Sequence, residues 1–243
     1  MSHRGDPFVV FLAVTAVASG LFWLAKVVPL LHKNLHAVIA LIFLYAPTLA
    51  ERWRGRTFDF QRAGMTMTPV RANLAVLGVA VAITFPLFLI GFFWFYDGVC
   101  GGSPASWLTR FHVLCPTAAW HGFSRGHIQL PPGTLVSLLN QIVVVALPEE
   151  IFFRGYLMGK LDERWPGRVR LFGAPVGWAL PVSALLFAFG HFLVDFNPQR
   201  LAPFFPGLLF GWMRIRARSV AAGTLFHALC NVLSDVLHVS FFG

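Results

Sequence analysis

The sequence predicts an all-α, polytopic bundle of about six to eight transmembrane helices. Of its 243 residues, 57% are hydrophobic and 12% are charged, whereas soluble domains carry about 25% charged residues. The mean hydropathy is +0.69. Several apolar runs approach the ~20 residues that a helix needs to cross the hydrocarbon core. A membrane barrel would instead need short alternating segments, which the sequence lacks.

The apolar runs define the candidate spans in chain order. No internal repeat or linker divides them, so we predict one integral membrane domain over residues 1–243. The first run continues through Leu24, beyond the signal-peptide-like AVAS at residues 16–19, which favours a retained span. The predicted spans cover residues 8–31, 35–50, 74–95, 135–156, 171–194 or 178–194, 201–213 and 219–241.

The net charge of +9 is explained by membrane topology. Most of the 19 basic residues lie near the N-terminus and in three connections, residues 52–71, 160–170 and 214–218. With seven spans these segments share one side, which the positive-inside rule assigns to the cytoplasm. We therefore expect a bacterial cytoplasmic-membrane protein with its N-terminus inside and anionic lipid headgroups as neighbours. Nucleic acid is not an expected partner.

The cysteines fall in two regions of the predicted topology. Cys100 and Cys115 lie in the large outer connection, residues 96–134. A disulfide between them is one reading and two free thiols are the other. Cys230 lies in the last span, where we expect it to pack as a small apolar residue.

The stretch VVVALPEEIFFRGYLMGKL, residues 143–161, places charges in a strongly apolar run. On a helix, Glu150 and Arg154 are i and i+4 and suit an ion pair, whereas Glu149 is turned away toward the rings that follow. Burial among rings disfavours a charged carboxylate, which suits a general base. Pro148 predicts a kink or a local opening. The alternative is a structural charge cluster, but Glu149 lies roughly 16 Å before Lys160 by helical rise.

Two histidines and an asparagine interrupt later apolar runs. His191 lies near the end of one span, and His227 and Asn231 lie at i and i+4 in the last. Singly, each is typical of a packing or interhelical hydrogen-bonding residue. Together with Glu149 they could hydrolyse a peptide bond through an activated water. Glu, His and His could also bind zinc, which leaves a zinc-dependent protease as an alternative.

Other chemistries are weakened by missing motifs. The sequence contains no Gly-x-Ser-x-Gly and no His-Glu-x-x-His, which disfavours the usual serine and zinc-helix proteases. A non-catalytic protein that uses the buried charges for ion conduction, or for binding a peptide or lipid, stays open as a different class.

Three motifs in order resemble the CPBP family of intramembrane endopeptidases, which includes CAAX proteases and bacteriocin-processing enzymes and is related to the type II prenyl-protein protease. They are Glu-Glu-x-x-x-Arg (Glu149, Glu150, Arg154), Phe-x-x-x-His (Phe187, His191) and His-x-x-x-Asn (His227, Asn231). The first 130 residues carry no such resemblance.

The resemblance implies a role for each motif residue. Glu149 would activate water, His191 would help to hold it, and His227 with Asn231 would form the oxyanion site. Glu150 and Arg154 would be a supporting ion pair, and no metal or other cofactor would be needed. The substrate would be a membrane-anchored protein or peptide. In a bacterium we expect cleavage at a C-terminal sorting signal or at a lipidated terminus.

Overall fold

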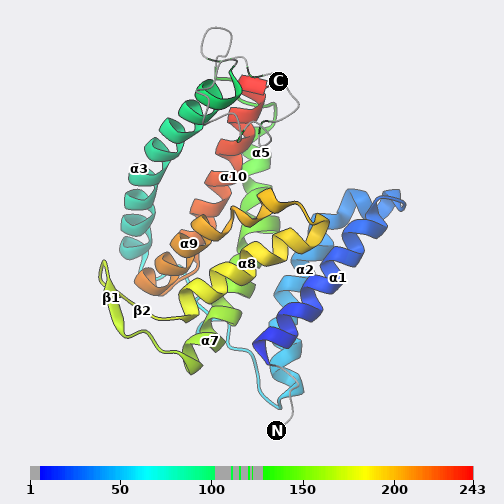
Figure 1. Ribbon diagram of the computed structural model, residues 1–243. Helices are drawn as coiled ribbons and strands as arrows, with labels where there is room; N and C mark the ends of the chain where they lie inside the picture. The colour runs from blue at the N-terminus through cyan, green and yellow to red at the C-terminus, as the bar shows by residue number, and fades with distance from the viewer. Residues whose placement is uncertain are drawn as a thin grey trace. The chain divides into compact units, whose positions relative to one another are not determined.

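The computed structural model confirms an all-α polytopic fold (Figure 1). It describes residues 6–101, 111, 115, 120, 122 and 128–242. The chain divides into two compact units, Met1–Leu77 with Ile142–His227, and Gly78–Gln141 with Ala228–Gly243. The single domain expected from sequence over residues 1–243 stays a prediction.

Five helical segments of the described chain are long and apolar enough to cross a membrane. Two shorter helices, α8 and α9, have 17 and 14 residues. The five are α1 (Pro7–Ala25), α2 (Pro29–Trp53), α3 (Val70–Phe95) with the π-helix η1 (Tyr96–Cys100), the segment Thr134–Arg164, and α10 (Ala221–Phe242).

The segment Thr134–Arg164 alternates between α- and π-helical winding. It runs through α5 (Thr134–Asn140), η3 (Gln141–Ala146), α6 (Leu147–Glu150), η4 (Ile151–Leu157) and α7 (Met158–Arg164), of which η3 and η4 are π-helical. Pro148, in α6, has no N–H for the preceding turn and its ring crowds that turn. Looser π winding on both sides makes room for the ring, so the predicted local opening takes the form of two π-helical stretches.

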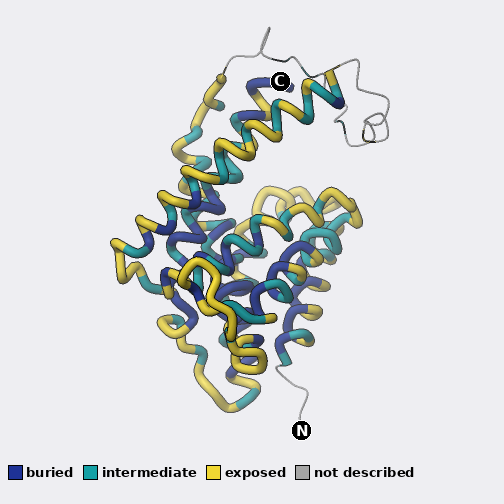
Figure 2. The backbone as a smooth tube through the Cα atoms, turned by 60° about the vertical axis from the view of Figure 1, so that its left-hand side comes forward, coloured by how far each residue is buried: buried dark blue, intermediate teal, exposed yellow. Residues whose placement is uncertain are grey.

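Burial is concentrated in the middle of this segment. Every residue from Glu150 to Met158 is buried (Figure 2). The chain therefore places Glu150 and Arg154 in the interior of the first unit.

A short hairpin replaces the earlier of the two predicted starts of the fifth span. Strands β1 (Val169–Leu171) and β2 (Ala174–Val176) pair antiparallel, and α8 (Ala179–Asp195) begins only after them. Phe172 and Gly173 at the turn have φ angles of 48° and 80°. Both left-handed angles belong to a two-residue hairpin turn, so a helix cannot start at Leu171.

Helices α8 and α9 (Phe204–Ala217) pack through small residues; the 3₁₀ turn η5 (Pro198–Leu201) lies between them in sequence. An added Cβ at Gly207 would lie 3.3 Å from Ala184 Cβ and from Phe187, and one at Gly211 would overlap Leu180. Gly207 and Gly211 are thus required for close helix packing within this unit.

The second unit has an aromatic core next to a disulfide. Trp120 stacks on Tyr96, with ring centroids 5.3 Å apart, and its Nε1 donates to Asp97 Oδ1 at 2.6 Å. Cys100 and Cys115 form a disulfide, which decides between the two readings left open by the sequence. Cys230 is a free thiol.

The disulfide makes a testable topological prediction. Alkylation of the denatured, unreduced protein should add one group, at Cys230, and alkylation after reduction should add three, because the chain has 3 cysteines. Intact mass spectrometry measures the difference. The variant Cys100→Ser is the control and should show two alkylated thiols before reduction. Three alkyl groups on the unreduced wild type would place the loop in a reducing compartment and contradict the predicted outer side.

Candidate active site

A buried ion pair lies at the centre of the candidate site. Arg154 Nη1 is 3.0 Å from Glu150 Oε1, and neither side chain has exposed surface. Arg154 Nη2 also donates to the carbonyl oxygen of Gly207 at 3.3 Å. Its guanidinium carbon lies 4.1 Å from the Phe187 ring centre and 5.0 Å from that of Phe210. The arginine is therefore held by charge, by a hydrogen bond and by two ring faces.

His227, on α10, lies between the two glutamates. Its Nδ1 is 3.4 Å from Glu150 Oε1 and its Nε2 is 3.9 Å from Glu149 Oε2. The imidazole stacks on Phe210, with centroids 4.8 Å apart and an interplanar angle of 19°. Each ring nitrogen thus faces a different carboxylate, and the stacked ring restricts rotation of the imidazole.

The two glutamates have different environments, although they are adjacent in sequence. Glu150 is fully enclosed, whereas the Glu149 side chain is 15% exposed, more than that of His227 at 8%. Among these groups Glu149 is the one that solvent reaches most easily. This arrangement agrees with the pairing of Arg154 and Glu150 that their i, i+4 spacing predicts.

Buried polar atoms without hydrogen-bond partners gather around this cluster. They include Glu149 Oε2, both Glu150 oxygens, Arg154 Nε and Nη1, and His227 Nδ1. Their ion-pair distances are short, but their geometries do not form hydrogen bonds. Unpartnered buried charges cost free energy, so retaining them in one place is typical of a functional site.

Gly223 is a neighbour of the cluster that sequence reasoning missed. An added Cβ there would lie 3.2 Å from Glu150 Oε2, so the α10 backbone approaches the carboxylate closely. Thr224, the next residue, has a buried hydroxyl without a hydrogen-bond partner. In the sequence, the only indication of this neighbour was a small residue followed by a polar one, Gly223 and Thr224, about one helical turn before His227.

His191, near the end of α8, is held by its own helix. Its Nδ1 is 2.9 Å from the carbonyl oxygen of Phe187. A carbonyl only accepts, so Nδ1 carries a hydrogen and donates it; in the tautomer with hydrogen on Nδ1 alone, Nε2 can accept. Within residues 6–101 and 128–242, His191 makes no ion-pair contact with Glu149.

Phe187 connects the predicted residues of the first unit. Its ring lies 4.6 Å from the His191 ring and 5.9 Å from the His227 ring, in addition to its contact with Arg154. The Phe-x-x-x-His motif therefore supplies a shared packing surface as well as a histidine.

Asn231 belongs to the second unit, one helical turn after His227 on α10. Its Nδ2 donates to Oε1 of Gln141 at 2.8 Å. Sequence reasoning did not single out Gln141, although a carboxamide inside the apolar run of residues 135–148 was a visible signal. The contact fixes which way the Asn231 amide faces.

The donor groups of the site do not form a metal cage. Across the described ranges, no three or more His, Cys, Asp or Glu side chains are grouped to hold a metal ion. The zinc-dependent alternative stays untested.

Comparison with known proteins identifies the segment that carries the site. No curated protein and no solved structure matches the chain. Residues 131–233, less than half of the chain, match the family described as type II CAAX prenyl endopeptidase Rce1-like. This confirms the resemblance predicted from the three motifs, and the matched segment contains all of them. The match over residues 131–233 supports a CAAX-type intramembrane protease at the level of the family.

Proposed function

We propose that this protein is a glutamate-dependent intramembrane endopeptidase in which Glu149 activates the attacking water. One observation carries the proposal. Glu149 is the most accessible member of a cluster whose other carboxylate, Glu150, is enclosed and paired with Arg154. A general base must reach water, whereas a positioning carboxylate must not exchange its partner for water.

The charges of the cluster support the assignment of His227. Glu150 and Arg154 neutralise each other, which lowers the cost of burying them and leaves the Glu149 carboxylate facing the His227 imidazole. His227 Nδ1 faces Glu150 and Nε2 faces Glu149, so a hydrogen carried by Nε2 is presented on the side of Glu149. A substrate carbonyl placed there would develop its negative charge next to a fixed donor.

The reaction then balances with the residues of this chain. Glu149 takes a proton from water as the oxygen bonds to the scissile carbonyl carbon, and the oxyanion accepts from His227, with Asn231 as the second proposed donor. The same proton passes to the leaving amine as the carbon–nitrogen bond breaks, which restores the Glu149 carboxylate. His191, with Nε2 as acceptor, is proposed to orient the water.

The proposed substrate is a membrane-anchored protein or peptide, cleaved near a C-terminal sorting signal or a lipidated terminus. The family match supports a peptide substrate within the lipid environment. Ion conduction is less well supported, because a conduction path needs polar groups spaced along the axis of the helix bundle. Here the four charged or titratable side chains form one cluster. Arg154 contacts Glu150, and His227 contacts both Glu150 and Glu149, each at less than 4 Å.

The variant Glu149→Gln should abolish cleavage without loss of folded protein. Removal of a general base costs about 10²- to 10⁴-fold in rate. Termini of the membrane proteome are labelled in cells that carry the wild type or the variant, and the wild type should produce termini that the variant lacks. Asp162→Asn on α7, an exposed carboxylate, is the matched control and should cleave like the wild type. Unchanged termini in a folded Glu149→Gln variant would contradict the proposal.

The variants Glu150→Gln and Arg154→Ala should lower folded yield as well as activity. Each change leaves a fully enclosed charge without its partner, which lowers the free energy of unfolding by about 3–5 kcal/mol. Detergent-solubilised yield and thermal unfolding measure the loss. Arg168→Ala removes an exposed arginine and should leave both unchanged. Wild-type stability in Arg154→Ala would show that the pair has no structural role.

Chelation separates the metal-free proposal from a zinc enzyme. After exhaustive chelation, with elemental analysis to verify removal, the wild type should retain full cleavage of a substrate found by terminal labelling. We expect activity without metal because, among the described residues, no three or more His, Cys, Asp or Glu side chains are grouped as metal ligands. Activity that is lost on chelation and restored by Zn²⁺ would instead establish the zinc mechanism.

A further inference from the structure

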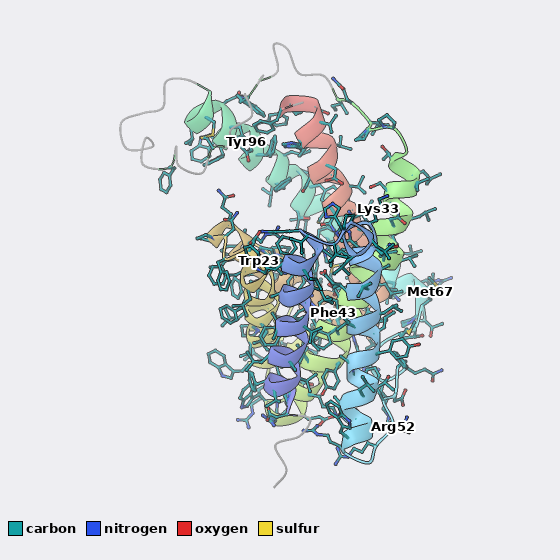
Figure 3. All side chains as sticks on the ribbon, turned by 90° about the vertical axis from the view of Figure 1, so that its right-hand side faces the viewer. Trp23, Lys33, Phe43, Arg52, Met67 and Tyr96 are labelled. Carbon is teal, nitrogen blue, oxygen red and sulfur yellow. A yellow bond between two sulfur atoms is a disulfide. The ribbon has the colours of Figure 1, made fainter. Side chains whose placement is uncertain are left out.

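An apolar groove lies between α1 and α2, remote from the glutamates in sequence. Its volume is about 830 Å³. Figure 3 shows the two helices side by side, with Lys33 near one end of α2 and Arg52 near the other. One face of each helix lines the groove: Val9, Val10, Ala13, Val14 and Val17 from α1, and Val38, Leu41, Ile42, Tyr45, Ala46, Leu49, Ala50 and Trp53 from α2.

The dimensions of the groove suit a lipid chain. From Val38 to Trp53 the helical rise gives roughly 22 Å, more than one leaflet of the ~30 Å hydrocarbon core. Small side chains, Ala46 and the buried Ala50, lie between larger exposed ones such as Leu41 and Leu49. Both helices are apolar enough to span the membrane, where a surface groove is filled by hydrocarbon.

The groove ends at a second cavity of different character. This basic pocket has a volume of about 530 Å³ and shares Trp53 with the groove. Its lining comprises Pro7, Trp53, Arg54, Arg56, Lys160, Glu163 and Arg164. Tryptophan is the residue most typical of the headgroup level of a bilayer. Apolar and cationic surfaces therefore meet where an acyl chain joins a headgroup.

The ion pairs of the basic pocket leave one positive charge in excess. Arg164 pairs with Asp6 at 2.6 Å, and Lys160 with Glu163 and Glu51 at 3.3 Å each. Glu51 also forms an ion pair with Arg54 at 3.5 Å. These three carboxylates offset three of the four cations. The exposed Arg56 makes no ion pair with any residue that the structure describes.

Asp6 counts as charged in this balance. Burial alone would raise the pKa of Asp6, but hydrogen bonds from Arg164 and from the backbone N–H of Phe8 outweigh burial and lower that pKa. The carboxylate is therefore ionised at neutral pH, and its pairing orients Arg164.

We propose that the groove and the basic pocket together bind one anionic phospholipid. The phosphate group lies in the basic pocket next to Arg56, and one acyl chain lies along α1 and α2. A phosphodiester carries one negative charge, which equals the excess of the pocket, and basic pockets between transmembrane helices are suited to anionic headgroups. Lys160 and Arg164 lie on α7, so the lipid would contact the same helical segment that carries Glu149.

Lipid retention tests this proposal. The full-length protein is purified from mixed micelles with equal amounts of phosphatidylglycerol and phosphatidylcholine of identical chains, and bound lipid is counted by native mass spectrometry. We expect about one phosphatidylglycerol per chain. Arg56→Gln should lower its retention about fivefold, since a basic residue near a membrane surface contributes ~1 kcal/mol. Arg62→Gln, an exposed arginine of the same connection, should have no effect.

A second pair of variants tests the groove. Ala46→Phe fills the groove and should lower retention of the lipid, whereas Ala16→Phe, on an exposed face of α1 outside the groove, should not. Equal retention of the two lipids, equal effects of Arg56→Gln and Arg62→Gln, or displacement of the lipid by millimolar inorganic phosphate would overturn the proposal. A dimer without bound lipid would also overturn it and assign the groove to a second copy of the chain.

Discussion

The candidate site depends on the buried ion pair between Glu150 and Arg154. A charge in the interior of an apolar bundle is costly unless a partner meets it, and this pair lies 3.0 Å apart with no exposed surface. Glu150 Oε1 also faces His227, and Arg154 also holds the carbonyl oxygen of Gly207. One pair therefore connects α6, η4, α9 and α10. The enclosed pair explains why the neighbouring Glu149 can remain accessible without disturbing the packing.

Aromatic rings complete this arrangement. Phe187 and Phe210 cover the guanidinium, and Phe210 also stacks on His227. Rings restrict rotation and exclude water, which strengthens the electrostatic interactions of the groups between them. The phenylalanine of the second motif is therefore as much a part of the site as the histidine four residues later.

The sequence was sufficient for the fold class and for the residues of the three motifs. Composition and apolar runs predict membrane helices because the bilayer leaves few alternatives. The i, i+4 spacing predicts which glutamate meets Arg154. Spacing could not show that His227 would lie between both carboxylates, because that contact joins helices far apart in sequence. It also could not show the β1–β2 hairpin, in which Phe172 adopts a left-handed backbone conformation that residues other than glycine rarely adopt. The roles of Glu149, His191, His227 and Asn231, and the supporting role of Glu150 and Arg154, stay predictions.

The absence of a side chain at residue 223 has a consequence for the position of His227. The backbone of α10 comes so near Glu150 that even a methyl group would lie 3.2 Å from its Oε2. His227 is on the same helix, one turn later. A side chain at 223 would require either Glu150 or this turn of α10 to shift by a few tenths of an ångström. The small size of residue 223 therefore allows α10 to hold the imidazole of His227 beside both carboxylates, although residue 223 lies one helical turn away from that histidine.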